Sequence, residues 1–348
     1  MAVIADQLLF GLVHDFLKVY LPKQKCASPH TIKAYRTTLE LLLDFVQQKK
    51  GITLAGITFE MLDSAMVNAF LSNLADERQC SASTQNHRLA CIRAFFKYAA
   101  MMEPAAVIHQ REIQKVAPKR VAEQPPRFMS EAAVKALLEQ PDTSTKLGVR
   151  DQFFMILLYD TAARIQEALS LRTKDFRLGK TPTATLNGKG QKIRTVPLSQ
   201  KTVEHFRNYV RVFHSEPGGK PDDPLFYTVQ YGEKRPMSDD NVRKFMKVYG
   251  EKARAVCPEV PEHIYPHLWR HSRAMHLYQH GMDLTLVSQW LGHVNLETTL
   301  IYAHADTEHK RRAIEKAMCA RDTDVDKAAF SRYRLTDDEM VKQLYGLK

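Results

Sequence analysis

Cysteine is scarce in this chain, and its arrangement excludes the structural roles that cysteine most often has. Five cysteines are scattered among 348 residues, and no two of them form a CxxC pair. An odd number without paired spacing indicates neither a disulfide framework nor a zinc ribbon. We therefore expect a reducing compartment. The five are Cys26, Cys80, Cys91, Cys257 and Cys319.

Long apolar runs and nucleotide-binding loops are also missing. No stretch approaches the roughly 20 apolar residues that cross a bilayer. The first residues do not follow the order of basic region, apolar run and cleavage site that marks a secretory signal. The sequence contains no GxxxxGK[ST] loop to hold a nucleotide phosphate. These absences predict a cytoplasmic protein with no membrane partner and no cofactor.

Negative charge is in deficit. The chain has 50 lysines and arginines against 39 aspartates and glutamates, a formal net charge of +11. Such a balance favours a polyanionic partner such as nucleic acid, with a merely basic surface as the alternative. The length exceeds that of a usual single core, so two domains are expected.

Residues 1–110 are predicted to form a small helical domain. Apolar side chains recur every three or four residues from Ile32 to Val46, after a helix start at Ser28. Further helices are expected at residues 59–74 and from Ser83 or Thr84. Five cations lie off the apolar stripes and are candidate phosphate contacts, with ordinary solvated helix faces as the alternative. They are Lys33, Arg36, Arg88, Arg93 and Lys97.

A second domain is predicted at residues 128–320, after a proline-bearing basic linker at 111–127. Helices are expected from Ser130 and at 151–171, 201–213 and 240–256. Residues 183–187 and 193–198 flank a glycine-rich loop and predict a β-hairpin. The tail at 321–348 contains a capping-box pattern before a short amphipathic helix at 335–345, which has little sequence around it to bury its apolar side.

Five motifs of the second domain occur in a characteristic order. They are YDTAARIQEAL at 159–169, GKGQKIR at 188–194, HLWR at 267–270, LGH at 291–293 and IY at 301–302. Together they resemble the signature of the tyrosine recombinases, enzymes that break and rejoin DNA. Residues 31–45 and 83–98 resemble the N-terminal core-binding domain of the same family. Ala162 and Ala163 depart mildly from the family pattern, which usually has glycine and an apolar residue there.

The resemblance implies a mainly α fold with a small antiparallel β-sheet. Its two domains would form a C-shaped clamp around duplex DNA: a helical, SAM-like core-binding domain and the catalytic domain. It also implies four protomers on two DNA sites, a dimer on each, with the tail helix docked into a neighbouring protomer. Accessory proteins are compatible with this assembly.

The residue types at these motifs suit attack on a phosphodiester. Guanidinium groups bind phosphate through paired hydrogen bonds and stabilise the charge that develops during attack, a role expected for Arg164 and Arg270. A surface ion pair with Glu167 is the alternative for Arg164, and Glu167 is otherwise expected to orient it. Tyr302 is the candidate nucleophile, and a phenol of pKa near 10 attacks only when its proton is removed.

Histidines and lysines complete the candidate site. His267 is the expected base and His293 the expected hydrogen-bond donor to the phosphate. By resemblance, Lys189 at the hairpin tip protonates the leaving oxygen, with Lys192 as a competitor. The remaining histidines of this region, His263, His271, His276 and His280, are expected to have ordinary structural roles. A zinc site at His267 and His271 is the weaker alternative, because the glutamate of a metalloprotease helix is missing and Arg270 would repel the cation.

The expected activity is site-specific recombination through a 3′-phosphotyrosyl intermediate, in the integration, excision or transposition of a mobile element or the resolution of DNA molecules. A prokaryotic, nucleoid-associated protein is expected. Two alternatives remain open: DNA relaxation of the type IB topoisomerase kind, and a DNA-binding regulator that keeps the fold without catalysis.

Overall fold

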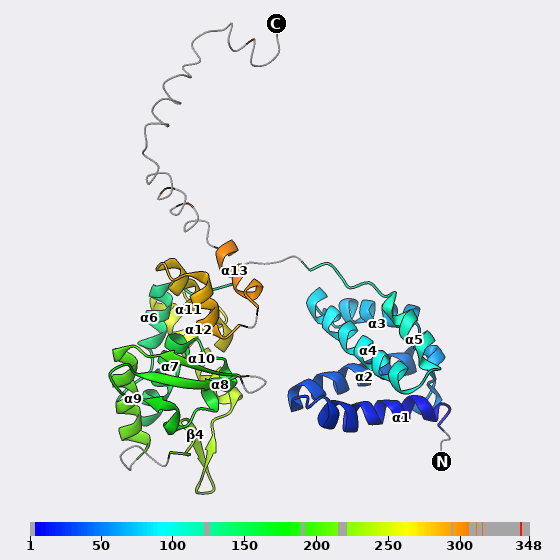
Figure 1. Cartoon of the computed structure of the whole chain (residues 1–348), viewed down its shortest axis with the longest axis horizontal. Helices are drawn as coiled ribbons and strands as arrows, with labels where there is room; N and C mark the ends of the chain where they lie inside the picture. The colour runs from blue at the N-terminus through cyan, green and yellow to red at the C-terminus, as the bar shows by residue number, and fades with distance from the viewer. Residues whose placement is uncertain are drawn as a thin grey trace. The chain divides into compact units, whose positions relative to one another are not determined.

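The computed structural model describes residues 4–121, 126–188, 192–214, 221–293 and 295–305, together with Arg311, Glu315 and Lys342. The chain divides into two compact units, Met1–Glu123 and Gln124–Lys348. Both are largely helical, and the second also carries two small antiparallel sheets (Figure 1). The prediction of a mainly α chain with a small antiparallel sheet is confirmed. None of the described helices combines the length and the apolar character needed to cross a membrane.

The first unit is built around α4, which packs against α2, α3 and α5. Serine side chains start the two longest helices: Ser28 accepts a hydrogen bond from the Thr31 amide, and Ser81 accepts one from the Thr84 amide. Its helices are α1 (Gln7–Asp15), η1 (Phe16–Gln24, π-helical), α2 (Pro29–Lys50), η2 (Leu54–Gly56) and η3 (Phe59–Met61), then α3 (Ser64–Asp76), α4 (Ala82–Met102) and α5 (Ala106–Gln114). Leucine and aromatic side chains fill much of its core.

Two boundaries of the first unit differ from those predicted. The helix expected at 59–74 is a short 3-10 turn followed by α3, because the Asp63 side chain accepts a hydrogen bond from the Met66 amide and starts a new helix there. The expected linker loses its first residues to α5, which continues through Gln114. Beyond α5, Asn86 on α4 exchanges two hydrogen bonds of 2.8 Å with the backbone of Lys119.

The second unit is built around the buried helix α7, which packs against α9 and α11. Phe153, Phe154 and Leu157 of α7 and Trp269 of α11 lie in its core. Its elements are α6 (Glu131–Leu138), α7 (Lys146–Thr161), α8 (Ile165–Leu169), η4 (Thr173–Asp175), β1 (Phe176–Arg177), β2 (Thr183–Asn187), β3 (Ile193–Pro197), α9 (Gln200–Phe213), β4 (Tyr227–Gln230), β5 (Glu233–Pro236), α10 (Asp239–Val256), α11 (Pro266–Gln279), α12 (Leu284–Leu291) and α13 (Glu297–Ala305).

The predicted hairpin is present, and a second one was not predicted. Strands β2 and β3 pair in antiparallel register from Thr183 opposite Pro197 to Asn187 opposite Ile193, with β1 on the far edge of β2. The second hairpin joins β4 to β5 through Tyr231 and Gly232, both of which have positive φ. That is the geometry of a tight two-residue hairpin turn.

The single helix expected at 151–171 is broken. Helix α7 ends at Thr161, Ala162 takes a φ of 50° in the left-handed region, and α8 begins at Ile165. Glycine adopts that conformation without steric cost, which explains why glycine is usual here in the family pattern. The break matters for the site, because it leaves Arg164 at the start of α8. Apart from Lys342, the predicted tail helix at 335–345 lies outside the described residues, and so does the hairpin residue Lys189.

Candidate active site

Arg164 is fixed by the start of α8. The Glu167 carboxylate accepts hydrogen bonds from the Arg164 backbone amide and from its Nη1, each 2.8 Å long, so Glu167 at the third helical position caps the start of α8. The Arg164 side chain is 37 % exposed, whereas that of Glu167 is only 4 % exposed. The guanidinium of Arg164 therefore has a buried anchor and an open outer edge.

Arg270 lies deeper, on the first turns of α11, and is 3 % exposed. Its Nη1 donates to the Ala162 carbonyl over 2.7 Å and its Nη2 to the Leu291 carbonyl over 2.6 Å. Burial, together with the charges of Arg164 and Arg194, lowers the pKa of Arg270 to about 9. The guanidinium is still charged at neutral pH, and it joins the end of α7 to the end of α12.

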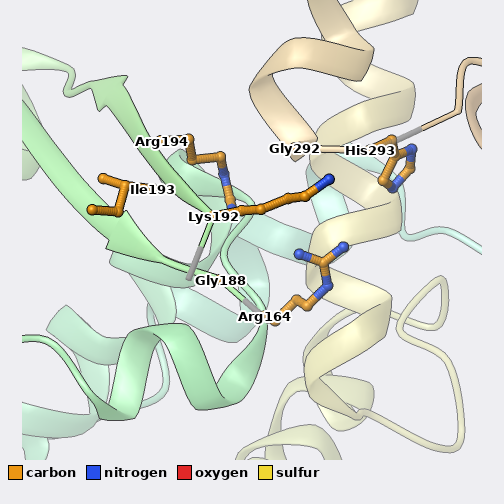
Figure 2. Close-up of a pocket in the computed structure, with 7 residues that line it drawn as sticks. All are labelled: Arg164, Gly188, Lys192, Ile193, Arg194, Gly292 and His293. Atoms are coloured by element: carbon orange, nitrogen blue, oxygen red, sulfur yellow. The ribbon is translucent and has the colours of Figure 1, made fainter. Parts of the chain in front are cut away.

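A cavity of about 430 Å³ opens beside these arginines. We call it the arginine pocket, and its lining residues are Arg164, Gly188, Lys192, Ile193, Arg194, Gly292 and His293. Figure 2 shows the side chains of Arg164, Lys192 and His293 reaching toward one another from three separate elements, whereas Ile193 points away. Cationic and hydrogen-bonding groups thus converge on one opening, an arrangement suited to a phosphate.

Tyr302 lies on α13 and is 1 % exposed. It packs with Ala162, Met275 and Leu291 in a small apolar cluster. Burial raises the pKa of Tyr302 to about 12, although the charge of Arg270 opposes that shift. The described lining of the arginine pocket does not include Tyr302. The phenol is therefore protonated at neutral pH and covered in this conformation.

The histidine bound to Tyr302 is not the one expected from the sequence. His271 Nδ1 lies 2.8 Å from the Tyr302 hydroxyl oxygen, whereas His267 has no hydrogen bond to any described residue. The sequence indicated an ordinary structural role for His271 and did not predict this contact with the candidate nucleophile. Burial, with the charges of His267 and Arg270, lowers the pKa of His271 to about 4. His271 is neutral at pH 7 and can accept a proton.

His267 faces a different environment. The residue is exposed, yet partial desolvation of its ring, with the charges of Arg270 and Arg164, lowers its pKa below the ordinary value. The rings of His267 and His271 are 6.2 Å apart between centroids. Among the described residues, no three histidine, cysteine, aspartate or glutamate side chains are grouped so as to hold a metal ion.

His293 stands at the rim of the arginine pocket. It follows Gly292, whose φ of +65° ends α12 in the left-handed conformation that glycine favours. His293 Nδ1 lies 2.8 Å from the hydroxyl of Thr299, a fully buried residue of α13. Burial, with Arg270 and Arg164 as the next causes, lowers the pKa of His293 to about 4. If Nδ1 accepts from Thr299, Nε2 carries the proton and can donate it in a hydrogen bond.

Of the two candidate lysines, only one is described. Lys192 is exposed where the hairpin loop meets β3 and lines the arginine pocket, while Lys189 lies among the residues left undescribed.

The five cations predicted on the first unit divide into two groups. Lys33, Arg36 and Lys97 are exposed. Arg88 instead donates from Nη1 to Thr38 Oγ1 over 2.8 Å, and Arg93 donates from Nη2 to the Gln114 carbonyl over 3.1 Å. Polar groups of neighbouring segments therefore already bind Arg88 and Arg93, and the contact of these two residues with phosphate stays a prediction.

Three residues of the site were not singled out from the sequence: Arg194, His271 and Thr299. Arg194 belongs to the GKGQKIR motif, His271 directly follows HLWR, and Thr299 precedes Tyr302 by one helical turn. Their proximity to the recognised motifs was the available signal. What gives each of them a role is a contact with a residue far away in the sequence or on another element.

Comparisons with known proteins identify the family of the chain. Residues 127–309 match the model of the phage integrase family, and residues 14–102 match the phage integrase N-terminal SAM-like domain. The chain is 33 % identical to tyrosine recombinase XerD of Listeria monocytogenes, over 84 % of this chain and 93 % of that protein. It is 30 % identical to tyrosine recombinase XerC of Pelotomaculum thermopropionicum, over 88 % of this chain and 97 % of that protein.

The fold is also known from solved structures. The XerH site-specific recombinase bound to palindromic difH substrate, in a post-cleavage complex, superposes with a TM-score of 0.64. It shares 23 % sequence identity, and the match covers 89 % of each chain.

Fold, site and sequence together define a DNA strand-exchange enzyme of the tyrosine type. The chain belongs to the phage integrase family, the site-specific tyrosine recombinases. The expected family and class of activity are confirmed.

Proposed function

We propose that the chain cuts and rejoins duplex DNA by transesterification, with Tyr302 as the nucleophile. The Tyr302 oxygen forms a bond to the scissile phosphorus while the bond from phosphorus to the 5′-oxygen breaks, leaving a 3′-phosphotyrosine and a free 5′-hydroxyl. A 5′-hydroxyl from a partner strand reverses the step. One phosphoester replaces another, so the reaction needs no nucleotide cofactor.

The observation that carries this proposal is the convergence of cations on the arginine pocket next to the Tyr302 cluster. Arg164 lines the pocket, and the buried Arg270 binds the Leu291 carbonyl, next to Gly292 of the pocket lining. We assign both to the non-bridging oxygens of the phosphate, where fixed guanidinium groups stabilise the charge of the transition state more than that of the ground state. His293 adds a hydrogen bond from Nε2.

Tyr302 must lose its proton in the reaction, and we assign the acceptor role to His271. The 2.8 Å hydrogen bond between His271 Nδ1 and the Tyr302 oxygen supports this assignment. The lowered pKa leaves His271 unprotonated at pH 7, although it also makes the imidazole a weaker base. The sequence-based candidate, His267, is then left near Arg164 and Arg270 as a further contact to the phosphate.

The burial of Tyr302 adds a step before chemistry. Its hydroxyl is covered in this conformation, so α13 must shift to bring the phenol to a phosphate seated in the arginine pocket. Tyr302 and the Thr299–His293 hydrogen bond share this helix. A shift of α13 therefore changes the nucleophile and one phosphate ligand together.

The leaving 5′-oxygen needs a proton, and a lysine of the β2–β3 hairpin supplies it. Lys192 reaches the pocket and supports this role. Lys189 remains the donor implied by resemblance, and substitution of each lysine alone separates them.

The partner we propose is duplex DNA in the cytoplasm, bound by both units, with two protomers at each site and four in the recombining complex. The basic balance of the chain and the exposed Lys33, Arg36 and Lys97 support DNA binding. Integration or excision of a mobile element and resolution of DNA molecules are both served by this chemistry.

The test begins with a DNA site selected from a random duplex library on the immobilised full-length protein. A plasmid carrying two copies of that site is then incubated with wild-type protein and with Tyr302→Phe. We expect recombinant circles with the wild type and none with the variant. Relaxed circles without recombinants would replace the proposal with a topoisomerase, and site-specific binding without any strand cleavage would replace it with a regulator.

A further inference from the structure

Arg194 was not among the sequence candidates, yet it lines the arginine pocket. It extends from β3 with a side chain that is 13 % exposed. Its Nη2 donates to Glu167 Oε2 over 2.8 Å and its Nε donates to the Trp290 carbonyl over 3.1 Å. One guanidinium therefore joins the hairpin strand, the start of α8 and the last turn of α12.

Two glycines make room for this bridge. A Cβ on Gly292 would lie 2.9 Å from Arg194 Cδ, and a Cβ on Gly188 would lie 3.2 Å from Glu167 Oε1. The Arg194–Glu167 pair therefore packs against the turn before His293 and against the start of the hairpin loop at Gly188. A larger residue at either glycine would require the neighbouring side chain or backbone to move.

Arg194 shares the negative charge of Glu167 with Arg164. Burial alone would raise the pKa of Glu167, but hydrogen bonds from Arg194 and Arg164 outweigh it and hold the pKa below its ordinary value. The buried carboxylate is therefore charged, and two arginines share it. Without Arg194, Arg164 would be the remaining partner of the charged Glu167 carboxylate. The positive charge of Arg164 would then be less available to a phosphate in the pocket.

We propose that Arg194 is a positioning residue for strand cleavage: by binding Glu167 and the Trp290 carbonyl, it leaves Arg164 available to phosphate and holds His293 at the pocket rim. This inference rests on the proposed function and concerns a residue outside the set that acts directly on the DNA.

The test measures single-turnover cleavage of a nicked duplex carrying the selected site, together with DNA affinity. Loss of a charged hydrogen-bonding partner in a buried pair predicts that Arg194→Gln cleaves about 30-fold more slowly, with less than a threefold change in affinity. Arg194→Lys keeps the charge but cannot span both acceptors, so its cleavage rate should lie between that of the wild type and that of Arg194→Gln. Arg177→Gln, an exposed arginine of β1 in the same sheet, should behave as wild type.

Charge balance gives a readout that a merely structural role would not produce. In Arg194→Gln/Glu167→Gln no unpaired carboxylate holds Arg164, so cleavage should recover by about fivefold over Arg194→Gln alone. If Arg194→Gln does not fold, the double variant still tests the inference. It then shows whether removal of the Glu167 carboxylate restores a folded enzyme that cleaves DNA.

Arg194→Gln cleaving within twofold of wild type would overturn the inference. So would a double variant that is no faster than, or no better folded than, Arg194→Gln. Because wild-type cleavage is measured in the same experiment, failure of the proposed function appears separately as an inactive wild type.

Discussion

The candidate DNA-contacting cations of the two units include side chains in two different settings. On the first unit, Lys33, Arg36 and Lys97 are exposed. In the second unit, Arg270 is almost fully buried and bound to two carbonyls, and Arg194 is bound to a carboxylate and a carbonyl. Surface cations contribute mainly affinity, which salt screens, whereas fixed and desolvated cations can distinguish a transition state from a ground state.

This contrast separates binding from chemistry. Substitutions on the first unit should change DNA affinity and its salt dependence, whereas substitutions around the arginine pocket should change the cleavage rate at saturating DNA.

Arg270 should show the largest effect. Arg270→Ala removes a preorganised guanidinium from the phosphate site, and we expect cleavage at saturating DNA to fall roughly 1,000-fold. Arg270→Lys, which keeps the charge with less disturbance of the core, should still lose most of the rate. The measurement is single-turnover cleavage, with the exposed Arg207→Ala of α9 as control. A normal cleavage rate in Arg270→Lys would show that the fixed guanidinium of Arg270 is not needed for chemistry.

His271 tests which histidine serves the nucleophile. His271→Asn removes the proposed proton acceptor, so cleavage should slow by about 100-fold, with a changed pH dependence at the acidic side. His267→Asn is the matched comparison one helical turn away and should have a smaller effect on that pH dependence. The reverse ranking would return the role to His267.

Thr299 tests the orientation of His293. Thr299→Val keeps the shape but removes the hydroxyl that meets His293 Nδ1, and we expect cleavage to slow by about tenfold. Thr299→Ser retains the hydroxyl and should recover most of the rate. Equal rates for the valine and serine variants would show that the hydrogen bond does not matter.

The first unit should affect affinity only. Replacing Lys33, Arg36 and Lys97 with glutamine should weaken DNA binding by about tenfold at moderate salt. The slope of log affinity against log salt should fall by about one for each DNA phosphate that the variant no longer neutralises. The control replaces Lys49 and Lys50 at the end of α2. A similar slope change in the control would mean that net charge alone matters.

Acid should weaken the fold through the site histidines. The pKa values of His271 and His293 fall from 6.5 to about 4 on folding, so the unfolded chain binds more protons between these values. Stability is therefore full above pH 6.5 and is lost as the pH falls toward 4. Thermal unfolding at pH 7 and pH 5 should show a lower midpoint at pH 5, and His271→Gln should reduce that difference by a few degrees. If His271→Gln shows the same difference between the two midpoints as the wild type, burial of His271 is not the cause of the acid sensitivity.

The sequence indicated the candidate residues that lie in short motifs, although it did not predict the helix break before Arg164. Arg164 and Tyr302 lie in short motifs whose helix starts and turns depend on neighbouring residues. By contrast, the His271–Tyr302 hydrogen bond joins residues 31 positions apart, and the Arg194–Trp290 bond joins residues 96 apart. Helix periodicity likewise places Arg93 on a polar face without showing that the end of α5 lies there to bind it.

The measurement that tests the account most directly is the position of the covalent link between protein and DNA. Wild-type protein is incubated with a nicked duplex carrying the selected site, the trapped adduct is digested with nuclease and protease, and the modified peptide is sequenced by mass spectrometry. The account predicts a nucleotide attached to Tyr302 and no adduct in Tyr302→Phe. A link at another residue, or an adduct that persists in Tyr302→Phe, would contradict it.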